Sequence, residues 1–344
     1  MSQEIIYVDQ ESNIPLFGLD FIGLIDRGTN VIELKPLTLC NLKCRYCFVS
    51  AGAYQNNFIV SSDYLIATLK KVINVKGKYD IEVHIAPYGE ILLYSELFSL
   101  LKKLNRLKGI DIISMQTNGL LLNAELIKNL EILGLTRINL SLNTFNSEKA
   151  AYFCDTKNYD IDTLRKIITL ILKSNIDLLL APVWFPGEND EDIEEIISFV
   201  KKFRKQGHNE SDLQIGIQKY LIYKTGRKLK KIRPKTWGYF YKQLSELEQE
   251  FDLKLKLGPI DFGIHPRKLL IPTKFKKGDK IATEIVSKGR WDYECIGKIR
   301  ENIGIKILLQ KPWKFSSELL GQTVQARIIK ANYKDNIITA VSEF

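Results

Sequence analysis

The sequence predicts an α/β domain followed by a small all-β barrel, from two patterns of apolar residues. Up to about residue 270, short apolar runs typical of buried strands alternate with longer runs that have the period of amphipathic helices. This alternation is typical of a parallel sheet with crossover helices. Beyond Leu270 only short strand-like runs between turn residues remain, which predicts a small barrel of the oligonucleotide-binding (OB) type. The expected domains are an N-terminal extension (1–29), an α/β domain (30–270) and a barrel (271–344).

Each element follows from its own run of residues. In the first expected helix, Leu65, Leu69 and Val72 fall on one face, and Ser62 is the expected N-cap.

Periodicity alone does not decide between an open sheet and a partial barrel, but in both the active site lies at the C-terminal ends of the strands. The expected strands are 31–35, 81–86, 111–116, 137–142, 177–181 and 213–218, the helices 63–75, 123–133, 162–173 and 190–205, and the barrel strands 280–286, 294–300, 303–308, 323–330 and 336–341.

Composition excludes several classes of protein. The chain has 344 residues, of which 45% are hydrophobic and 26% charged, so wholesale disorder is excluded. No apolar run has the length of a membrane helix, and residues 1–30 lack a signal pattern. Five cysteines do not make a disulfide scaffold. We therefore expect a cytoplasmic protein with no membrane partner.

Positive charge is concentrated in the C-terminal half. The net charge is +10, and residues 201–240 alone contain twelve basic and two acidic side chains. Such a window indicates a polyanionic partner, and the alternative is a set of solvated lysines on helices. The two interpretations have equal weight from charge alone.

Three of the five cysteines lie in the loop after the first expected strand. Cys40, Cys44 and Cys47 fall within eight residues, and three thiolates this close can hold a soft metal centre. A [4Fe–4S] cluster has four irons that each take one outer ligand, so three thiolates leave one iron open. The alternative is a structural zinc site, which needs a fourth ligand such as His84 or Cys154.

This C-x₃-C-x₂-C spacing, with an aromatic residue before the last cysteine, resembles the radical S-adenosylmethionine (SAM) superfamily over about residues 30–257. The resemblance implies a partial (βα)6 TIM-like barrel, a [4Fe–4S] cluster held by Cys40, Cys44 and Cys47, and SAM chelated to the open iron. In that family an electron from the cluster cleaves SAM, and the 5′-deoxyadenosyl radical abstracts hydrogen from the substrate. An electron donor such as ferredoxin or flavodoxin is then expected.

Further family landmarks follow at successive strand ends. Gly89-Glu90 resembles the segment that receives the methionine ammonium, although Ile91 replaces the usual proline. Glu90 could instead cap a helix, and the other strand-end residues could be ordinary turn or solvated polar groups. By the resemblance, Tyr46 and Val183 lie near the adenine, Thr117 or Asn118 faces SAM, and Ser141 and Asn143 contact the ribose. Cys154 and Cys295 are expected to be small buried residues.

The C-terminal piece resembles a TRAM domain, a small RNA-binding barrel, through residues 277–280, 295–299 and 320–328. The resemblance implies RNA contacts, with Trp291, Tyr293 or Trp313 stacking on bases. The alternative is a barrel with core aromatics and solvated lysines. The basic residues of 201–240 extend the same expected RNA-binding surface. Trp237, in this stretch, is expected on a helix with its side chain in the hydrophobic core. The candidate RNA-binding residues are Lys276, Lys277, Lys298, Arg300, Arg327 and Lys330.

Together these features predict a radical SAM enzyme that modifies RNA, with tRNA as the first candidate and no DNA partner. The alternative is a radical SAM maturase that acts on a peptide or small-molecule precursor, and a third interpretation is a non-catalytic RNA-binding protein. Only Cys154 and Cys295 remain for other uses, too few for a second all-cysteine cluster, which argues against sulfur insertion.

Overall fold

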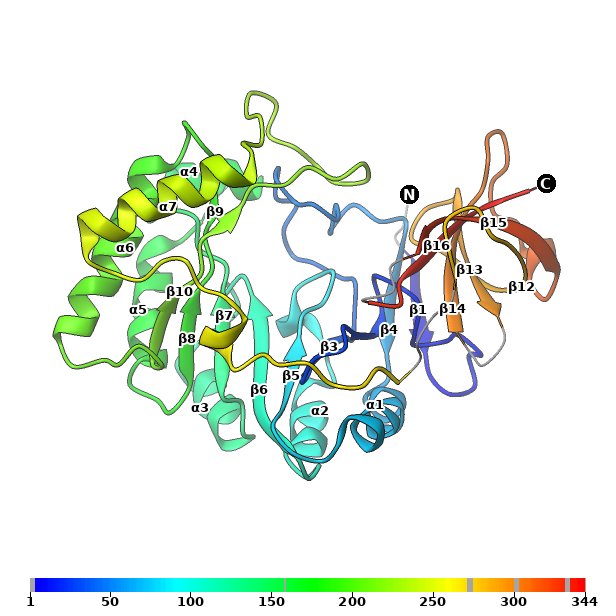
Figure 1. Cartoon of the computed structure of the whole chain (residues 1–344), viewed down its shortest axis with the longest axis horizontal. Helices are drawn as coiled ribbons and strands as arrows, with labels where there is room; N and C mark the ends of the chain where they lie inside the picture. The colour runs from blue at the N-terminus through cyan, green and yellow to red at the C-terminus, as the bar shows by residue number, and fades with distance from the viewer. Residues whose placement is uncertain (1–3, 158, 271–274, 300–302, 332–334, 344) are drawn as a thin grey trace. The chain divides into compact units, whose positions relative to one another are not determined.

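The structure is a computed structural model that describes residues 4–157, 159–270, 275–299, 303–331 and 335–343. It divides the chain into two compact units. The first unit comprises Met1–Leu39, Ala53–Asp111 and His265–Phe344, and the second comprises Cys40–Gly52 and Ile112–Ile264 (Figure 1). Within the described ranges, every helix is too short or too polar to cross a membrane.

The second unit contains four parallel strands in the order β10-β8-β7-β6. Their apolar side chains are buried, as the continuous apolar runs predict for strands covered on both faces. Two of the helices begin at side-chain caps, Asn123 before α3 and Asp160 before α5. The strands are β6 (Ile110–Thr117), β7 (Arg137–Leu140), β8 (Asp177–Leu180) and β10 (Leu213–Ile215), and the predicted helices are α3 (Ala124–Ile132), α5 (Ile161–Ile171) and α6 (Asp190–Lys205).

Several elements of the second unit were not predicted. A two-stranded parallel ladder of β9 (Val183–Trp184) and β11 (Gln218–Lys219) continues beyond the ends of β8 and β10. Helix α4 (Ser147–Cys154) follows β7. Helix α7 (Trp237–Phe251) packs on α6 and agrees with the helix expected at Trp237, but Trp237 itself is 52% exposed, because α7 buries Phe240 and Leu244 instead. A short 3-10 helix, η2 (Pro259–Phe262), comes near the end of this unit.

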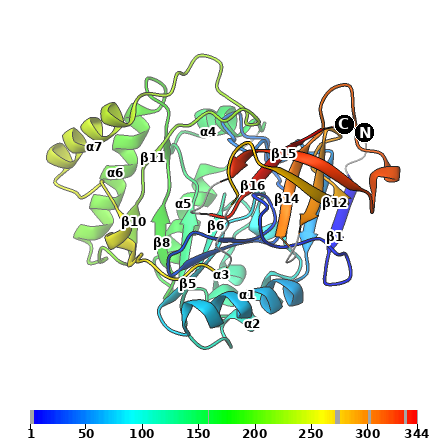
Figure 2. The same ribbon diagram turned by 45° about the vertical axis from the view of Figure 1, so that its right-hand side comes forward.

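The first unit contains β5 (Ile81–Ile85), β3 (Val31–Lys35) and β2 (Gly23–Asp26) in that order, with β3 and β5 parallel. A separate parallel pair joins β1 (Glu4–Val8) and β4 (Asn56–Val60). Helices α1 (Ser62–Lys76) and α2 (Leu97–Leu104) lie side by side (Figures 1 and 2). The predicted strands and α1 are confirmed.

The predicted cap of α1 is wrong by one residue. Ser61 is the N-cap, and its hydroxyl accepts a hydrogen bond from the Tyr64 amide. Ser62 is the first helical residue, and its hydroxyl donates to Glu96 at 2.6 Å. Because Ser61 and Ser62 are chemically identical, only the backbone geometry distinguishes them.

The C-terminal strands close into a five-stranded barrel, as predicted (Figure 2). Its core is made mainly of β-branched residues that alternate along the strands, with Cys295 fully buried among them. The predicted burial of Cys295 is confirmed, and burial raises the pKa of its thiol to about 12. The TRAM identity of the barrel stays a prediction. The strands are β12 (Lys280–Lys288), β13 (Glu294–Ile299), β14 (Ile303–Leu308), β16 (Ile338–Ser342) and β15 (Thr323–Ala331), in barrel order.

Within the first unit, the barrel packs directly on the N-terminal segment. The Gly304 amide donates to the Phe17 carbonyl at 2.6 Å, and a Cβ on Gly18 would lie 1.9 Å from the Gly304 carbonyl oxygen. Only glycine allows this approach of two backbones. The Lys306 ammonium also lies 2.6 Å from the mostly buried Asp20 carboxylate. The barrel and the N-terminal segment thus form one packed body.

Asp20→Asn should destabilise the protein by about 2 kcal/mol at pH 7. Burial alone raises the pKa of Asp20, but Lys306 and Arg290 outweigh it and lower this pKa from 3.8 to about 2. A depressed pKa contributes stability above the unfolded value, and this contribution is lost as the pH falls through about 2. Urea unfolding of both proteins should give curves that converge at low pH. The exposed Asp111→Asn variant is the control, and an equal loss there would contradict the assignment.

Candidate functional site

The cysteine loop, Cys40–Gly52, belongs to the second unit, and its three cysteines are partly buried. Two turns bend it at Cys47: the Cys47 amide donates to the Cys44 carbonyl, and the Ser50 amide donates to the Cys47 carbonyl. The Ala51 amide points at the Cys47 sulfur, with the nitrogen 3.3 Å from Sγ. An N–H aimed at sulfur favours the thiolate, which is the form that binds metal.

Arg227 connects this loop to the segment after β11. Its Nε donates to the Cys44 carbonyl and its Nη2 to the Ala51 carbonyl, both at 2.7 Å, and its backbone amide donates to the Cys47 carbonyl at 2.8 Å. Its Nη1 is buried and has no hydrogen-bond partner in the described part of the chain. Sequence reasoning missed Arg227, because nothing in the motif distinguishes it from the other basic residues of its window.

Two neighbours of Arg227 tighten the same junction. The Ser50 hydroxyl donates to the Thr225 carbonyl at 2.8 Å. A Cβ on Gly226 would lie 2.5 Å from the Phe48 carbonyl oxygen, so only glycine fits this close approach. Residues 225–227 therefore hold residues 44–51 of the cysteine loop from one side.

The end of α4 holds the other side of the loop. The Arg45 amide donates to the Phe153 carbonyl at 2.8 Å, and the Arg45 guanidinium pairs with Asp155 at 2.8 Å. Cys154 is 6% exposed, so the predicted burial of this residue is confirmed. Its hydrogen bond to Cys44, together with burial, raises the pKa of Cys44 well above the ordinary value. Burial also raises the pKa of Cys47.

The chemistry of this loop fits an iron–sulfur cluster. Its donors are thiols from one short segment, which suit iron, and a metal's own charge deprotonates thiols whose pKa is raised by burial. The thiolates would bring negative charge into a partly buried site, where the unpartnered Nη1 of Arg227 offers a compensating cation. Among the described residues, no three His, Cys, Asp or Glu side chains are already arranged around a metal position.

Asn143 brings three of the predicted SAM-contacting residues together. Its Nδ2 donates to the Tyr46 hydroxyl at 2.7 Å, and its Oδ1 accepts from the Val183 amide at 2.8 Å. The buried Asn189 supports this network, because its Nδ2 donates to the carbonyls of Asn143 and Val183. Asn189, in the turn between β9 and α6, was not predicted. Tyr46 and Val183 are thus fixed relative to each other by polar contacts.

The other strand-end residues of the second unit make local contacts. The Asn118 amide group donates to Asn41 of the cysteine loop at 2.8 Å, which connects the end of β6 to that loop. Thr117 is buried, and its hydroxyl accepts from the Gly119 amide, as in an ordinary turn. Ser141 accepts from Gln116 at 2.8 Å. The roles of these residues in SAM binding stay predictions.

Gly89 and Glu90 lie in the first unit, beside the residue that precedes the cysteine loop. The Glu90 amide donates to the Leu39 carbonyl at 2.7 Å. The Glu90 carboxylate accepts from the Leu92 amide and caps the 3-10 helix η1 (Ile91–Leu93), so the capping alternative holds in this structure. A carboxylate keeps further acceptor positions, so capping leaves the predicted contact with the methionine ammonium open.

Gly89→Ala should lower iron content severalfold, and SAM cleavage with it, and should destabilise the chain, because the new Cβ would lie 1.8 Å from the Leu39 carbonyl oxygen. Relief of this clash requires movement of the backbone directly before Cys40. Thermal unfolding and iron content should both report the change. Gly238→Ala, in helix α7 with open space around the new Cβ, is the control and should be neutral or slightly stabilising. Normal iron content in Gly89→Ala would contradict the assignment.

Comparison with known proteins shows the family of this chain. Residues 34–200 match the family model of the Radical SAM superfamily. The chain is 36% identical to the uncharacterized protein MJ0103 of Methanocaldococcus jannaschii, over 97% of this chain and 80% of that protein. It is 28% identical to the GTP 3′,8-cyclase of Lactiplantibacillus plantarum over 51% of this chain, and spans only 52% of that relative. The family match therefore defines an enzyme class that uses an iron–sulfur cluster and SAM. The chain belongs to the Radical SAM superfamily.

Solved structures show the same fold at low sequence identity. Streptococcus suis SuiB bound to S-adenosylmethionine has a TM-score of 0.51 and 18% identity, over 72% of this chain and 52% of SuiB. HydG, a maturase of the [FeFe]-hydrogenase, has a TM-score of 0.51 and 12% identity, over 76% of this chain and 54% of HydG. The predicted α/β partial barrel is therefore confirmed, and the five-stranded barrel follows it in the sequence. Membership of the superfamily implies a [4Fe–4S] cluster and SAM.

Proposed function

We propose that this radical SAM enzyme forms a 5′-deoxyadenosyl radical and uses it to modify a peptide or small-molecule precursor. The cysteine loop held by Arg227 carries the proposal, because it is the part of the chain suited to a cluster with an open iron. The names of similar proteins, GTP 3′,8-cyclase and a SuiB structure bound to precursor peptide SuiA, support a substrate of this kind.

The chain's own residues would hold the reactants and exclude water. When bound, the cluster supplies the electron that cleaves SAM. Cys40, Cys44 and Cys47 would hold it, and the Arg227 cation would offset part of the thiolate charge. Asn143 fixes the Tyr46 ring, which also packs on Phe185 with ring centroids 4.9 Å apart. An apolar cluster behind this ring would keep water from a radical that reacts with any nearby C–H bond. It comprises Phe153, Phe185, Tyr220, Leu229 and Ile232.

The contacts made by the candidate RNA-binding residues of the barrel support an RNA substrate less than the positive charge of the barrel suggests. Lys298 is partly buried and bonds to Asn13, and Arg327 pairs with Glu343 at 3.2 Å. Arg300 lies outside the described residues. Of the candidate stackers, Trp291 lies flat beside Tyr293, with 2° between the ring planes, and also contacts Tyr54. Only Lys276, Lys277 and Lys330 among the candidates are exposed and make no ion pair within the described ranges.

These three exposed lysines keep RNA as a second candidate substrate. If the barrel binds tRNA, the triple variant Lys276→Gln/Lys277→Gln/Lys330→Gln should weaken tRNA binding severalfold and flatten its salt dependence, since each phosphate contact adds to the slope. Filter binding at several salt concentrations measures both quantities. Lys70→Gln/Lys71→Gln/Lys108→Gln, with the same charge change on the α1–α2 side, is the control. Equal effects in both variants would argue against a barrel site.

The experiment that tests the proposed function is anaerobic. Protein reconstituted with iron and sulfide is reduced with dithionite in the presence of SAM, and 5′-deoxyadenosine is measured by mass spectrometry. We expect slow uncoupled cleavage without substrate and faster cleavage with a true precursor. Reconstituted protein that binds iron but leaves SAM intact would contradict the proposal. If only tRNA stimulates cleavage, the second candidate replaces the first.

A further inference from the structure

The cysteine loop presents different side chains on its two sides. On the inner side, the Tyr46 hydroxyl accepts a hydrogen bond from Asn143, and the Tyr46 ring packs on Phe185. Phe48, only two residues later, is 51% exposed, and its ring lies instead beside that of Tyr223, with centroids 5.7 Å apart. Tyr223 is itself 50% exposed. The loop therefore has an inner side, where the predicted SAM-contacting residues lie, and an outer side that offers two aromatic rings to solvent.

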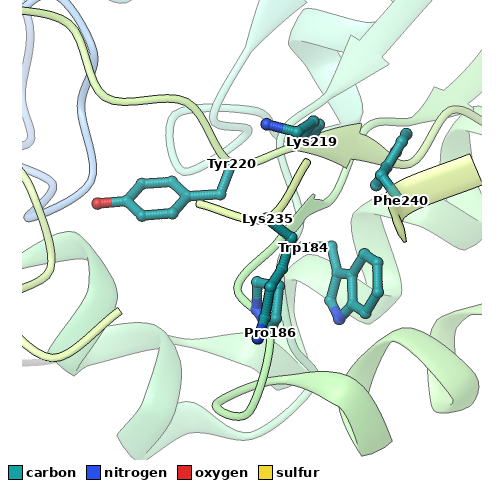
Figure 3. Close-up of a pocket in the computed structure, with 6 residues that line it drawn as sticks. All are labelled: Trp184, Pro186, Lys219, Tyr220, Lys235 and Phe240. Carbon is teal, nitrogen blue, oxygen red and sulfur yellow. The ribbon is translucent and has the colours of Figure 1, made fainter. Parts of the chain in front are cut away.

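The segment that carries Tyr223 is held in a defined loop. At its base, the Tyr220 hydroxyl accepts from the Leu229 amide at 2.9 Å, and the Tyr220 ring, drawn in Figure 3, is buried. At its tip, the Gly226 amide donates to the Tyr223 carbonyl at 3.0 Å. Arg227 then binds the segment to the cysteine loop through the contacts described above. The fold itself thus places Tyr223 on the outer side, so little order has to be gained when a partner binds there.

The segments that form this side carry positive charge. Residues 40–52 and 218–232 contain two and six basic side chains, respectively, and no acidic one. Three of these, Lys43, Lys224 and Lys228, are exposed and make no ion pair within the described ranges. Such a set of uncompensated charges attracts an acidic partner, and the attraction extends over about 10 Å at 0.1 M salt. We call the following residues the outer surface: Lys43, Phe48, Tyr223, Lys224 and Lys228.

The position of the outer surface favours a partner that delivers electrons. When bound, the cluster supplies the electron that cleaves SAM, and that electron has to be replaced. Cys154 and Cys295 are too few for a second cluster, so the replacement comes from another protein. A substrate has to meet the radical on the inner side, whereas a donor passes its electron to the cysteine loop from the outer side. The outer surface therefore suits an electron donor better than a substrate.

We propose that the outer surface docks a small acidic flavoprotein, whose exposed flavin edge packs on Phe48 and Tyr223. An acid that contacts the cysteine loop, Asp155, is already paired with Arg45 and leaves the three lysines to the partner. The reduced flavin gives up one electron, and the same electron reduces the cluster, so no bond forms or breaks and no further reactant is needed. The inference rests on the cluster of the proposed function but not on its substrate.

The test is binding of oxidised flavodoxin, an acidic flavoprotein, to the anaerobically reconstituted holoenzyme, measured by calorimetry. At about 0.1 M salt, Lys43→Gln/Lys224→Gln/Lys228→Gln should weaken binding by about tenfold, because the attraction between opposite charges is lost. The difference should shrink at about 1 M salt, where charges are screened within about 3 Å. SAM cleavage driven by reduced flavodoxin should slow in the same variant, whereas cleavage driven by dithionite should not change.

Lys128→Gln/Lys166→Gln/Lys173→Gln is the matched control in the same unit. It removes the same charge from exposed positions on or directly after helices α3 and α5. This variant should change the affinity for flavodoxin by about twofold or less, since net charge alone contributes little at this salt concentration.

Tyr223→Ala should weaken flavodoxin binding severalfold at both salt concentrations, because the aromatic contact does not depend on charge. Tyr241→Ala is its control, since Tyr241 is also 50% exposed and its ring also packs on another exposed ring, that of Trp237. The control should leave flavodoxin binding unchanged, and neither variant should alter cleavage driven by dithionite.

Four results would overturn this inference. They are no binding of flavodoxin by the wild-type holoenzyme, equal losses in the two lysine variants, tighter binding of a ferredoxin than of flavodoxin, and displacement of flavodoxin by a short RNA that binds more tightly. Cleavage driven by dithionite separates this inference from the proposed function. If dithionite supports cleavage but flavodoxin does not bind, only the docking surface is contradicted, whereas flavodoxin binding without cleavage by either reductant contradicts the proposed function.

Discussion

Replacement of Cys40, Cys44 or Cys47 by alanine should abolish SAM cleavage and lower bound iron, while the chain remains folded. Each thiol supplies one ligand of the cluster. The three thiols bind three irons and leave the fourth iron open, so two remaining thiols cannot keep the cluster in place. The cysteine loop makes its structural contacts through backbone carbonyls and neighbouring side chains rather than through the three sulfurs alone. Iron content, visible absorption and 5′-deoxyadenosine formation measure the loss, and circular dichroism measures folding.

Cys295→Ala is the matched control for this series. Its thiol is fully buried in the barrel core, so the substitution removes a sulfur of the same kind without touching the loop. We expect normal iron content with a small loss of thermal stability from the cavity. Retained SAM cleavage in any of the three loop variants, or loss of iron in Cys295→Ala, would contradict the assignment of the cluster ligands.

Arg227→Gln should lower the iron bound after reconstitution by severalfold and shift the reduction potential of any remaining cluster to a lower value. The substitution removes both side-chain hydrogen bonds to the cysteine loop, and it also removes the cation beside the thiolates. This cation favours the more negative reduced form of the cluster, so its loss lowers the reduction potential. Arg227→Lys should restore part of the potential but not the iron content, since an ammonium cannot span two carbonyls as a guanidinium does. Electron paramagnetic resonance during redox titration measures the potential.

Arg204→Gln is the control for Arg227. The Arg204 guanidinium also donates two hydrogen bonds to a backbone carbonyl of the second unit, that of Leu213, but it has no contact with the cysteine loop in the described structure. It should cost similar stability and leave iron content and potential unchanged. If both variants lose iron equally, the role of Arg227 is general folding and not the support of the cluster.

The features that could be predicted from the sequence are those that depend on a local pattern of residues. The parallel strands, the five barrel strands and the three-cysteine motif all have a period or a spacing that can be counted. Arg227 and Asn189 could not be found this way, because their roles arise from contacts with residues far along the chain. Trp237 was misplaced for the same reason, since a helix with aromatic residues on several sides does not reveal which side it buries.

The barrel shows a similar limit of sequence reasoning. Its lysines and arginines indicated a phosphate-binding surface, yet Lys306 and Lys288 pair with Asp20 and Glu4 of the N-terminal segment. Charge counted along a sequence does not show which cations are neutralised by acids hundreds of residues away.

Packing of the barrel on the N-terminal segment sets an order of events during synthesis. Phe17 emerges from the ribosome early, but its partner Gly304 is made about 290 residues later, roughly 15 to 60 s at bacterial or archaeal elongation rates of about 5–20 residues per second. Until then Leu19, which is fully buried in the finished protein, stays exposed to water or to a chaperone. The nascent first unit cannot close before residue 304 has been made, so chains that terminate before Gly304 should aggregate rather than form a shortened enzyme.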